Sequence, residues 1–402
     1  MNIKKLRITR KNHRYALRGK IINVRRIIYY IFIAIFSSLL GFYLSNVLLF
    51  HTTSFTQLLP EKKEVIGFLP YETLSRAKTY YSGITTLAYF ALTIGDDGNI
   101  VKLQTPQQED PGWYALSSGK VNPFLQSAKA HNQSLALVVF SGNNDVISNL
   151  VSNPLKNGQT LAHDLLPVMH KYGFTKLNID IEATATASSS SQKQFGQFIK
   201  SLSSAMQNGG INEISLDMSP SDFVKSDLID PSLVSPMVNQ VVVMAYDYHS
   251  TSSIVTGPVA PLSGAGISLE YDTEAAVKNA LMTIPSDKLL LGMPLYGYEW
   301  DTLTTGDRIA SIPGSGVVAS NKRAEALLST CANCKNSYDM IDQEEHVSYF
   351  DPSANLYHVL YYPTKQSTQA KITFAKDNNL GGVALWALGF EGSTILSPLQ
   401  SY

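Results

Sequence analysis

The 402-residue chain has few cysteines, and it lacks the short motifs of several common enzyme classes. No GxSxG or GxxxxGK[ST] run occurs, which argues against serine-hydrolase and P-loop nucleotide chemistry. The eight histidines stand without the spacing of metal ligands. Cys331 and Cys334 are the only cysteines; they can form a short disulfide or remain two free thiols, whereas a zinc site would need two further soft ligands. We therefore expect neither a metal nor a cofactor.

The first 26 residues contain no acidic side chain, although the whole chain balances 32 basic against 32 acidic residues. This segment carries ten of the basic residues, so residues 27–402 hold the other 22 against all 32 acids. The neutral total thus combines a +10 segment with a −10 remainder. A nucleic-acid-binding tail is one explanation of the basic segment. The apolar run that follows it favours the basic flank of a membrane span instead, so we expect no nucleic-acid partner.

The residues that follow, 27–50, contain no formal charge and are rich in Ile, Leu, Phe and Tyr. At about 1.5 Å per residue, a helix of this length would span roughly 36 Å, against about 30 Å for the hydrocarbon core of a bilayer. The basic flank predicts a cytoplasmic N-terminus, so the segment indicates a signal anchor in the cell membrane, a linker over 51–63, and an extracellular domain over 64–402. The alternative is a cleaved signal peptide, whose apolar region is usually shorter.

Eight short apolar runs follow, separated by segments with helical periodicity. Each run is mostly continuous, as in parallel strands covered on both faces. Strand and helix alternating eight times predict an α/β fold, a (β/α)8 barrel, with an ordinary doubly wound sheet as the alternative. The runs are Val65–Leu69, Ile84–Leu92, Leu135–Phe140, Leu177–Ile181, Ile214–Met218, Val241–Ala245, Leu289–Met293 and Gly382–Leu385. Nearly ninety residues separate the last two, and we interpret 301–363 as a small α+β lobe inserted there.

Polar and apolar residues alternate along the fourth run. A period of two places Asn178, Asp180 and Glu182 on one face of the strand, with Glu182 nearest the carboxyl end. Two carboxylates this close repel each other when buried, which raises the pKa of one of them and yields a general acid at neutral pH. The alternative is a structural Asp beside a solvated Glu.

Residues that suit a sugar follow two other strands. The sixth run ends at Tyr246 and Asp247, which add a hydroxyl and a carboxylate to the same rim. The eighth ends at Trp386, whose flat ring could pack against a sugar face or simply fill the core. Together these residues predict a sugar-binding site.

Four motifs in this order resemble those of the family 18 glycoside hydrolases, which include the chitinases. That family carries DGxDxDxE, MxYDY, GxPxYG and a GG-x-x-x-W run on its fourth, sixth, seventh and eighth strands. The counterparts here are 175–182, 244–248, 292–297 and 381–386. Within the family, the chain is most similar to the bacterial spore-germination and cortex-lytic branch.

The resemblance implies a retaining mechanism in which the 2-acetamido group of the sugar is the nucleophile. Catalytic roles would fall to Glu182 as the acid and then base, to Asp180 as its partner, and to Tyr246 and Asp247, which would position the acetamide. The expected substrate-binding residues are Asn178, Met244, Trp386, Tyr296 and Tyr71.

Three positions depart from the family pattern. Thr175 and Lys176 replace Asp-Gly, and Asn178 replaces the first inward Asp, so its hydrogen bonds are kept but its charge is lost. We expect a change in pH profile, and a bulky Lys176 could shift the strand. The sequence still predicts a membrane-anchored hydrolase of β-linked N-acetylglucosamine polymers, with peptidoglycan first and chitin-type oligosaccharides second. The alternatives are a glycan-binding, lectin-like protein and a protein-binding scaffold.

Overall fold

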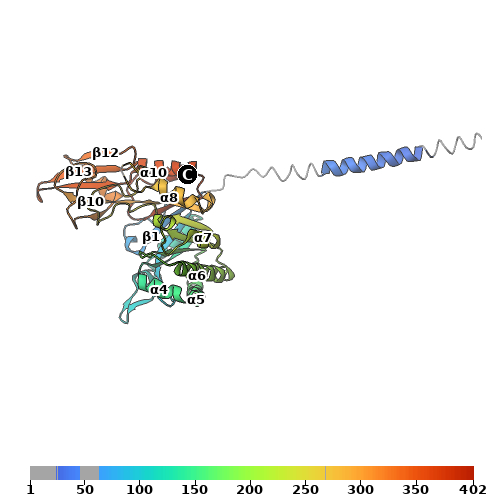
Figure 1. Ribbon diagram of the computed structural model, residues 1–402, viewed down its shortest axis with the longest axis horizontal. Helices are drawn as coiled ribbons and strands as arrows, with labels where there is room; N and C mark the ends of the chain where they lie inside the picture. Colours follow the sequence, from blue (N-terminus) through green and yellow to red (C-terminus); the bar gives the residue numbers. More distant parts are fainter. Residues whose placement is uncertain (1–23, 25, 46–62, 268) are drawn as a thin grey trace, which may run out of the picture. The chain divides into compact units, whose positions relative to one another are not determined.

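The computed structural model describes residue 24 and residues 26–45, 63–267 and 269–402, which form parts of two separate compact units, Met1–Lys62 and Lys63–Tyr402 (Figure 1). In the first unit, one helix covers Arg26–Ser45 with a mean hydropathy of 2.1. Its length and composition suit a membrane span and equally an N-terminal signal sequence. The rest of the predicted span, residues 46–50, and nearly all of the predicted basic segment and linker lie outside the described residues.

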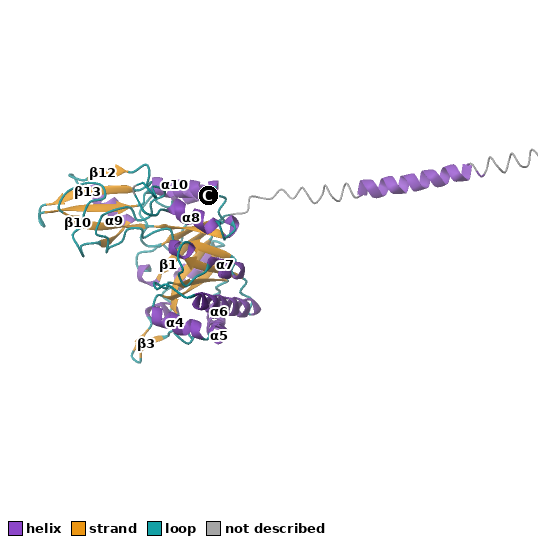
Figure 2. Ribbon diagram, in the orientation of Figure 1, coloured by secondary structure: helices purple, strands orange, loops and turns teal. Residues whose placement is uncertain are grey.

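The second unit is built on a closed barrel of eight parallel strands, which confirms the predicted barrel and makes the open-sheet alternative wrong (Figure 2). Around the barrel the order is β1-β15-β9-β8-β7-β6-β5-β2. Each of the eight predicted runs overlaps one barrel strand, although the run Ile84–Leu92 begins two residues before its strand and Val241–Ala245 ends two residues after its strand. The barrel strands are β1 (Glu64–Pro70), β2 (Thr86–Thr93), β5 (Ser134–Ser141), β6 (Lys176–Ile181), β7 (Glu213–Met218), β8 (Gln240–Val243), β9 (Leu289–Pro294) and β15 (Gly382–Trp386).

Helices cover the outside of the barrel, and their amphipathic patterns bury one face each. Local signals set their ends: the Ser188 side chain caps the start of α6, and Gly173 ends α5 with a left-handed backbone (φ 77°). The barrel helices are α2 (Pro111–Ser117), α3 (Asn122–Ala130), α4 (Asn144–Ser152), α5 (Pro154–Tyr172), α6 (Ser189–Asn208), α7 (Pro231–Val234), α8 (Thr273–Leu281) and α10 (Lys365–Asp377). A small hairpin, β3 (Leu103–Thr105) and β4 (Gln108–Glu109), lies between β2 and α2.

The inserted lobe lies between β9 and β15 in the chain and projects to one side of the barrel (Figure 1). Its antiparallel sheet has the order β11-β10-β14-β13-β12 and carries α9 (Asn321–Thr330). The strands are β10 (Tyr296–Thr302), β11 (Val317–Ser320), β12 (Lys335–Tyr338), β13 (Glu345–Asp351) and β14 (Leu356–Tyr362). The sheet begins at Tyr296 rather than near Asp301, because the apolar YGYEW segment pairs with β11 and β14.

A buried acidic residue joins this lobe to the barrel. Glu344 is 1% exposed and accepts hydrogen bonds from the backbone N–H groups of Val259 and Ala260 and from the Lys371 ammonium, at 2.8 to 3.1 Å. Since all its partners are fixed, the buried charge is compensated. Cys331 and Cys334 form a disulfide directly after α9. Of the two predicted alternatives for this pair, a short disulfide or two free thiols, the structure therefore has the disulfide.

The bottom of the barrel is closed by Lys176, the first residue of β6. Its ammonium lies 2.7 Å from Glu64 of β1 and 2.8 Å from Glu213 of β7, and Glu64 also accepts hydrogen bonds from Thr85 and Thr86. Burial raises the pKa of Glu64, but the charge of Lys176 and the hydrogen bonds from Lys176, Thr85 and Thr86 together outweigh burial and hold that pKa below its usual value. Lys176 therefore fills the barrel floor and pairs with both glutamates, and β6 keeps regular pairing with both neighbours.

Candidate active site

The polar face of β6 points into the barrel, as the alternation predicts. Asn178 and Asp180 are 0% and 4% exposed, and Glu182 follows the strand at the rim, exposed to solvent. The backbone N–H of Glu182 donates to the carbonyl of Ser141 at 2.9 Å, which holds this position against β5. Asp180 therefore lies in the barrel interior and Glu182 lies at the open rim, on the same face of one strand.

Asp180 is a buried carboxyl group with an unmet acceptor. Its Oδ1 is buried and has no hydrogen-bond partner among the residues that the structure describes. Burial raises the pKa of Asp180 well above its usual value, and the nearby carboxyl groups of Asp217 and Glu182 raise it further. Both effects favour the protonated form of Asp180 over the ionised form.

Asp217 of β7 forms the second half of this acidic pair. Burial raises the pKa of Asp217 to about 8, Glu182 adds to the rise, and a hydrogen bond from Asn178 opposes it. The Asn178 amide donates to Asp217 at 2.7 Å and to the hydroxyl of Ser215 at 2.9 Å. Asn178 thus holds Asp217 in place. Because Asn178 lies in the barrel interior beneath the rim, the structure does not place it in contact with a substrate.

Glu182 stands above this pair at the solvent-accessible end. The surrounding protein removes part of its water and raises its pKa, and Asp247 raises it further. A carboxyl group with a raised pKa that remains open to solvent is suited to give a proton to a bound substrate and take one back.

Asp247 faces the same pocket from the loop after β8. Its backbone adopts a left-handed conformation (φ 61°), which Asp tolerates better than most residues. Its carboxylate accepts hydrogen bonds from the hydroxyls of Tyr296 at 2.5 Å and Tyr298 at 2.8 Å. These bonds lower the pKa of Asp247, but burial outweighs them and raises it. The two lobe tyrosines therefore fix the orientation of Asp247.

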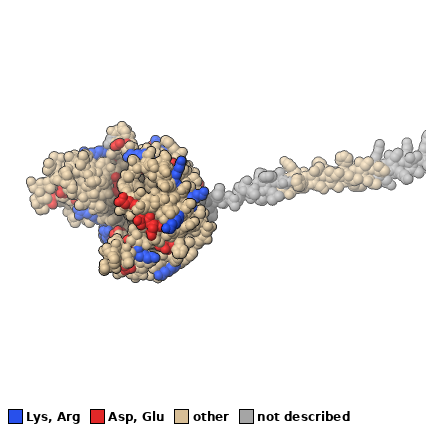
Figure 3. Space-filling view, turned by 60° about the horizontal axis from the view of Figure 1, so that its bottom comes forward, with Lys and Arg blue, Asp and Glu red and all other residues tan. Residues whose placement is uncertain are grey.

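A pocket of about 630 Å³ contains these acidic side chains at the carboxyl end of the barrel. Tyr246 and Met244 line it from the end of β8, and Trp386 lines it from the end of β15. The Trp386 ring packs edge-on against Phe90 and Phe68, with centroids 4.6 and 5.8 Å away. In Figure 3, acidic side chains gather in a band near the middle of the visible face. The pocket offers carboxyl groups, a hydroxyl and an aromatic surface together.

Close backbone packing explains one of the glycines in the seventh-strand motif. A Cβ at Gly292 would lie 2.5 Å from the carbonyl oxygen of Val243 and 3.1 Å from the Tyr246 ring. Any larger residue there would push against the strand and the ring that form the pocket wall.

The structure places most of the predicted site residues together. Asp180, Glu182, Met244, Tyr246, Asp247 and Trp386 line the pocket. Asn178 lies beneath it and Tyr296 holds Asp247 from behind, so neither lines the pocket. Tyr71 does not line it either; it follows β1 and packs against the outer core between strands and helices.

Several lining residues were not predicted, and Asp217 had a signal in the sequence. The run Ile214–Met218 alternates apolar and polar residues as β6 does, which places Ser215 and Asp217 on the inward face. Asp222, whose pKa burial raises to about 7, comes from the loop after β7 and has no such periodic signal.

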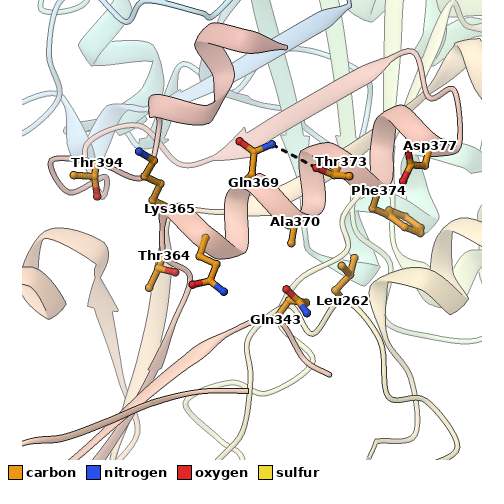
Figure 4. A pocket seen from close by; sticks show the side chains of 11 residues that line it. Leu262, Gln343, Thr364, Lys365, Gln369, Ala370, Thr373, Phe374, Asp377 and Thr394 are labelled. Atoms are coloured by element: carbon orange, nitrogen blue, oxygen red, sulfur yellow. Dashed lines mark hydrogen bonds between the residues drawn. The ribbon is translucent and has the colours of Figure 1, made fainter. Parts of the chain in front are cut away.

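A larger and more open hollow of about 860 Å³ lies elsewhere, over the outer face of α10 (Figure 4). Its side chains are mainly amides and hydroxyls, such as Gln369, which donates to Thr373 at 3.4 Å. None of the carboxyl groups described above lines it. In the described part of the chain, no three His, Cys, Asp or Glu side chains are placed to hold a metal ion.

Comparisons with known proteins agree on one family. The family model described as glycosyl hydrolases family 18 matches residues 26–391. The cortical fragment-lytic enzyme of Bacillus subtilis (strain 168) is 23% identical over 274 residues, which are 65% of this chain and 58% of that protein. The chain thus spans less than two thirds of that relative.

Two solved structures share the fold. The Group IV chitinase of Ostrinia furnacalis matches with a TM-score of 0.71 at 19% identity, covering 85% of this chain and all of that one. The spore cortex-lytic enzyme SleL of Bacillus megaterium QM B1551 matches with a TM-score of 0.64 at 18% identity, covering 84% of this chain and 73% of that one.

Proposed function

We propose, from the premise that this chain belongs to glycosyl hydrolases family 18, that it cleaves glycans containing β-linked N-acetylglucosamine. One observation carries the proposal: the solvent-open Glu182 stands directly after a strand whose buried Asp180 has no partner for its Oδ1 among the described residues, inside a pocket that Trp386 also lines. A solvent-open acid above two buried carboxyl groups with raised pKa values is an arrangement suited to protonate a glycosidic oxygen.

In the proposed reaction, Glu182 gives its proton to the leaving oxygen while the bond to the anomeric carbon breaks. The oxygen of the sugar's own 2-acetamido group attacks that carbon, as the family pattern implies. Asp180 accepts a hydrogen bond from the acetamide N–H through its unpartnered Oδ1, and Tyr246 and Asp247 orient the group. Glu182 then takes a proton from the water that opens the cyclic intermediate, which restores the acid.

The substrate is, in this proposal, a wall glycan in preference to chitin. The relatives named for cortex lysis support a bacterial wall polymer, and the relative named as a chitinase supports chitin-type oligosaccharides as a second substrate. We also propose that the helix Arg26–Ser45 anchors the protein in the cell membrane with the pocket-bearing unit outside, because a strongly basic segment precedes it. Protease added to intact cells would then degrade that unit; full protection would contradict this orientation.

The hydrolase proposal is tested with the full-length chain and its Glu182→Gln variant. The wild type should release reducing ends from chitohexaose or purified peptidoglycan, and the variant should be slower by about 10² to 10⁴ because the transferable proton is lost. Circular dichroism and thermal unfolding confirm that the variant is folded.

Glycan binding by both forms is measured in parallel. If the wild type binds these glycans as tightly as the variant and releases no reducing ends, the protein is a glycan-binding module. If it binds no glycan and a protein partner instead, it is a scaffold. Either result rejects the hydrolase.

A further inference from the structure

One basic side chain, Lys225, lines the pocket that holds the carboxyl groups. Among the described residues that line this pocket, no other Lys, Arg or His occurs. Its acidic lining residues are Asp180, Glu182, Asp217, Asp222, Asp227 and Asp247. Among the described lining residues, Lys225 is therefore the one positive charge that the pocket offers to a ligand.

The backbone that carries Lys225 is fixed. The short helix Pro220–Phe223 is closed by a capping box, in which the Ser219 N–H donates to the Asp222 carboxyl group at 2.8 Å. The N–H of Lys225 then donates to the carbonyl oxygen of Ser221 at 2.8 Å. Lys225 is therefore presented to the pocket from a defined position.

The Lys225 ammonium forms no ion pair or hydrogen bond with the residues that the structure describes. Within the described part of the chain, no carboxylate oxygen lies within 4.0 Å of it, although Asp222 and Asp227 line the same pocket. The Lys225 side chain is exposed to solvent. Its charge thus remains available to a ligand, in contrast to the Lys176 charge, which two glutamates consume.

Lys225 also lines a second, smaller hollow of about 210 Å³. This hollow shares Tyr246, Asp247 and Lys225 with the main pocket and continues past them to Tyr271. The two hollows therefore share part of their walls, and Lys225 lies in the shared part. Because Lys225 lines the same pocket as Glu182 and Trp386, it is placed to contact a glycan that binds there.

We infer that Lys225 is a specificity-determining residue that binds a carboxylate on the glycan beside the cleaved bond. The inference rests on the proposed function and narrows its substrate class to N-acetylhexosamine polymers that carry carboxylates, in preference to neutral chitin. An exposed ammonium is a point charge with three donors, which suits a carboxylate on a flexible substituent. In peptidoglycan, that carboxylate can belong to the lactyl ether on the sugar or to an attached peptide.

The acidic surroundings do not repel such a ligand as strongly as their number suggests. Burial raises the pKa of Asp217 to about 8 and of Asp222 to about 7. The pKa of Asp180 is raised as well. These shifts reduce the negative charge of the pocket near neutral pH, which weakens its repulsion of a carboxylate bound at Lys225.

The test compares KM values for three substrates in the full-length wild type and in Lys225→Ala. The substrates are neutral chitohexaose, peptide-free glycan strands with free lactyl carboxylates, and peptide-bearing strands whose lactyl carboxyls are tied up as amides. For a carboxylate-bearing substrate, the ratio of its KM to that of chitohexaose should rise about 3- to 10-fold in the variant. A rise with the peptide-free strands identifies the lactyl group, and a rise with the peptide-bearing strands alone identifies the peptide.

Two controls separate the inference from its premise. Lys200→Ala removes the same charge from the exposed face of α6 outside both hollows, and it should leave the KM ratios unchanged. Added salt should weaken the wild-type preference for charged substrates, because exposed charges are screened. Binding of the same glycans to Glu182→Gln, with and without Lys225→Ala, reports on Lys225 even if no substrate is cleaved. Equal ratios or equal binding ratios in Lys225→Ala and its parent overturn the inference.

Discussion

The two ends of strand β6 treat charge in opposite ways. At the bottom, Lys176 is held by Glu64 and Glu213, and every charge has a partner. At the rim, four residues further on, Asp180 is buried without a partner for its Oδ1 and lies near a second carboxyl group, Asp217. One strand therefore carries a compensated ion cluster at its start and an uncompensated acid cluster at its end.

The difference in pKa follows from this contrast. Lys176 holds the pKa of Glu64 down despite burial, so folding favours the ionised carboxylate there. At the rim, burial and like charge raise the pKa of Asp180, so folding favours its protonated form. The ion pairs of Lys176 stabilise the fold. The unpaired carboxyl groups at the other end of β6 destabilise it, but their raised pKa values suit them to proton transfer.

The largest stability effect is expected at the bottom of the barrel. Lys176→Met should lower the free energy of unfolding by about 1–3 kcal/mol, because it leaves the largely buried Glu64 without its cation. Urea unfolding followed by fluorescence measures this loss. The matched control is Lys278→Met, which breaks an exposed pair with Glu274 and should give no measurable change. Equal losses in both variants would show that the buried cluster adds nothing.

A smaller effect of opposite sign is expected at the rim. Asp180→Asn should raise the free energy of unfolding at pH 7 by about 1 kcal/mol, because the amide avoids the cost of a buried ionisable group. It should also lower the hydrolytic rate by about 100-fold. Since the pKa of Asp180 is raised on folding, its contribution to stability is complete below pH about 4 and is lost as the pH rises.

The contribution of Asp180 to stability should therefore fall as the pH rises above about 4, and Asp180→Asn should lack this part of the pH dependence. Asp227→Asn is the control, because Asp227 lines the same pocket but is only half-buried. Unfolding curves at a series of pH values measure the difference. If Asp180→Asn is less stable than the wild type at every pH, the acid cluster is a stabilising feature and the contrast within β6 fails.

The sequence predicted the barrel because continuous apolar runs alternate with amphipathic segments, and this pattern depends only on local order. Asp180, Glu182 and Asp247 could be placed on one rim for the same reason: strand ends of a parallel barrel meet there. The partners of these residues could not be predicted. The bonds from Tyr296 and Tyr298 to Asp247 depend on how the lobe folds back.

Two positions show where the sequence reasoning fell short. Lys176 stands where the family has a small residue, and its bulk suggested a shifted strand; the structure instead uses its length to reach Glu64 on another strand. Tyr71 follows the first strand, yet it packs in the outer core, because the direction of a side chain after a strand end depends on the turn that follows.

The central claim is that the residues at the start of β6 stabilise the fold, whereas those at its carboxyl end carry out the reaction. It is tested most directly by measuring turnover per folded molecule and the urea midpoint on the same preparations of wild type, Glu182→Gln and Lys176→Met. We expect Glu182→Gln to unfold at the same urea concentration as the wild type and to turn over at least about 100-fold more slowly. We expect Lys176→Met to unfold at a lower urea concentration, while its folded molecules turn over at the wild-type rate. Parallel losses of turnover and midpoint in both variants would contradict the account.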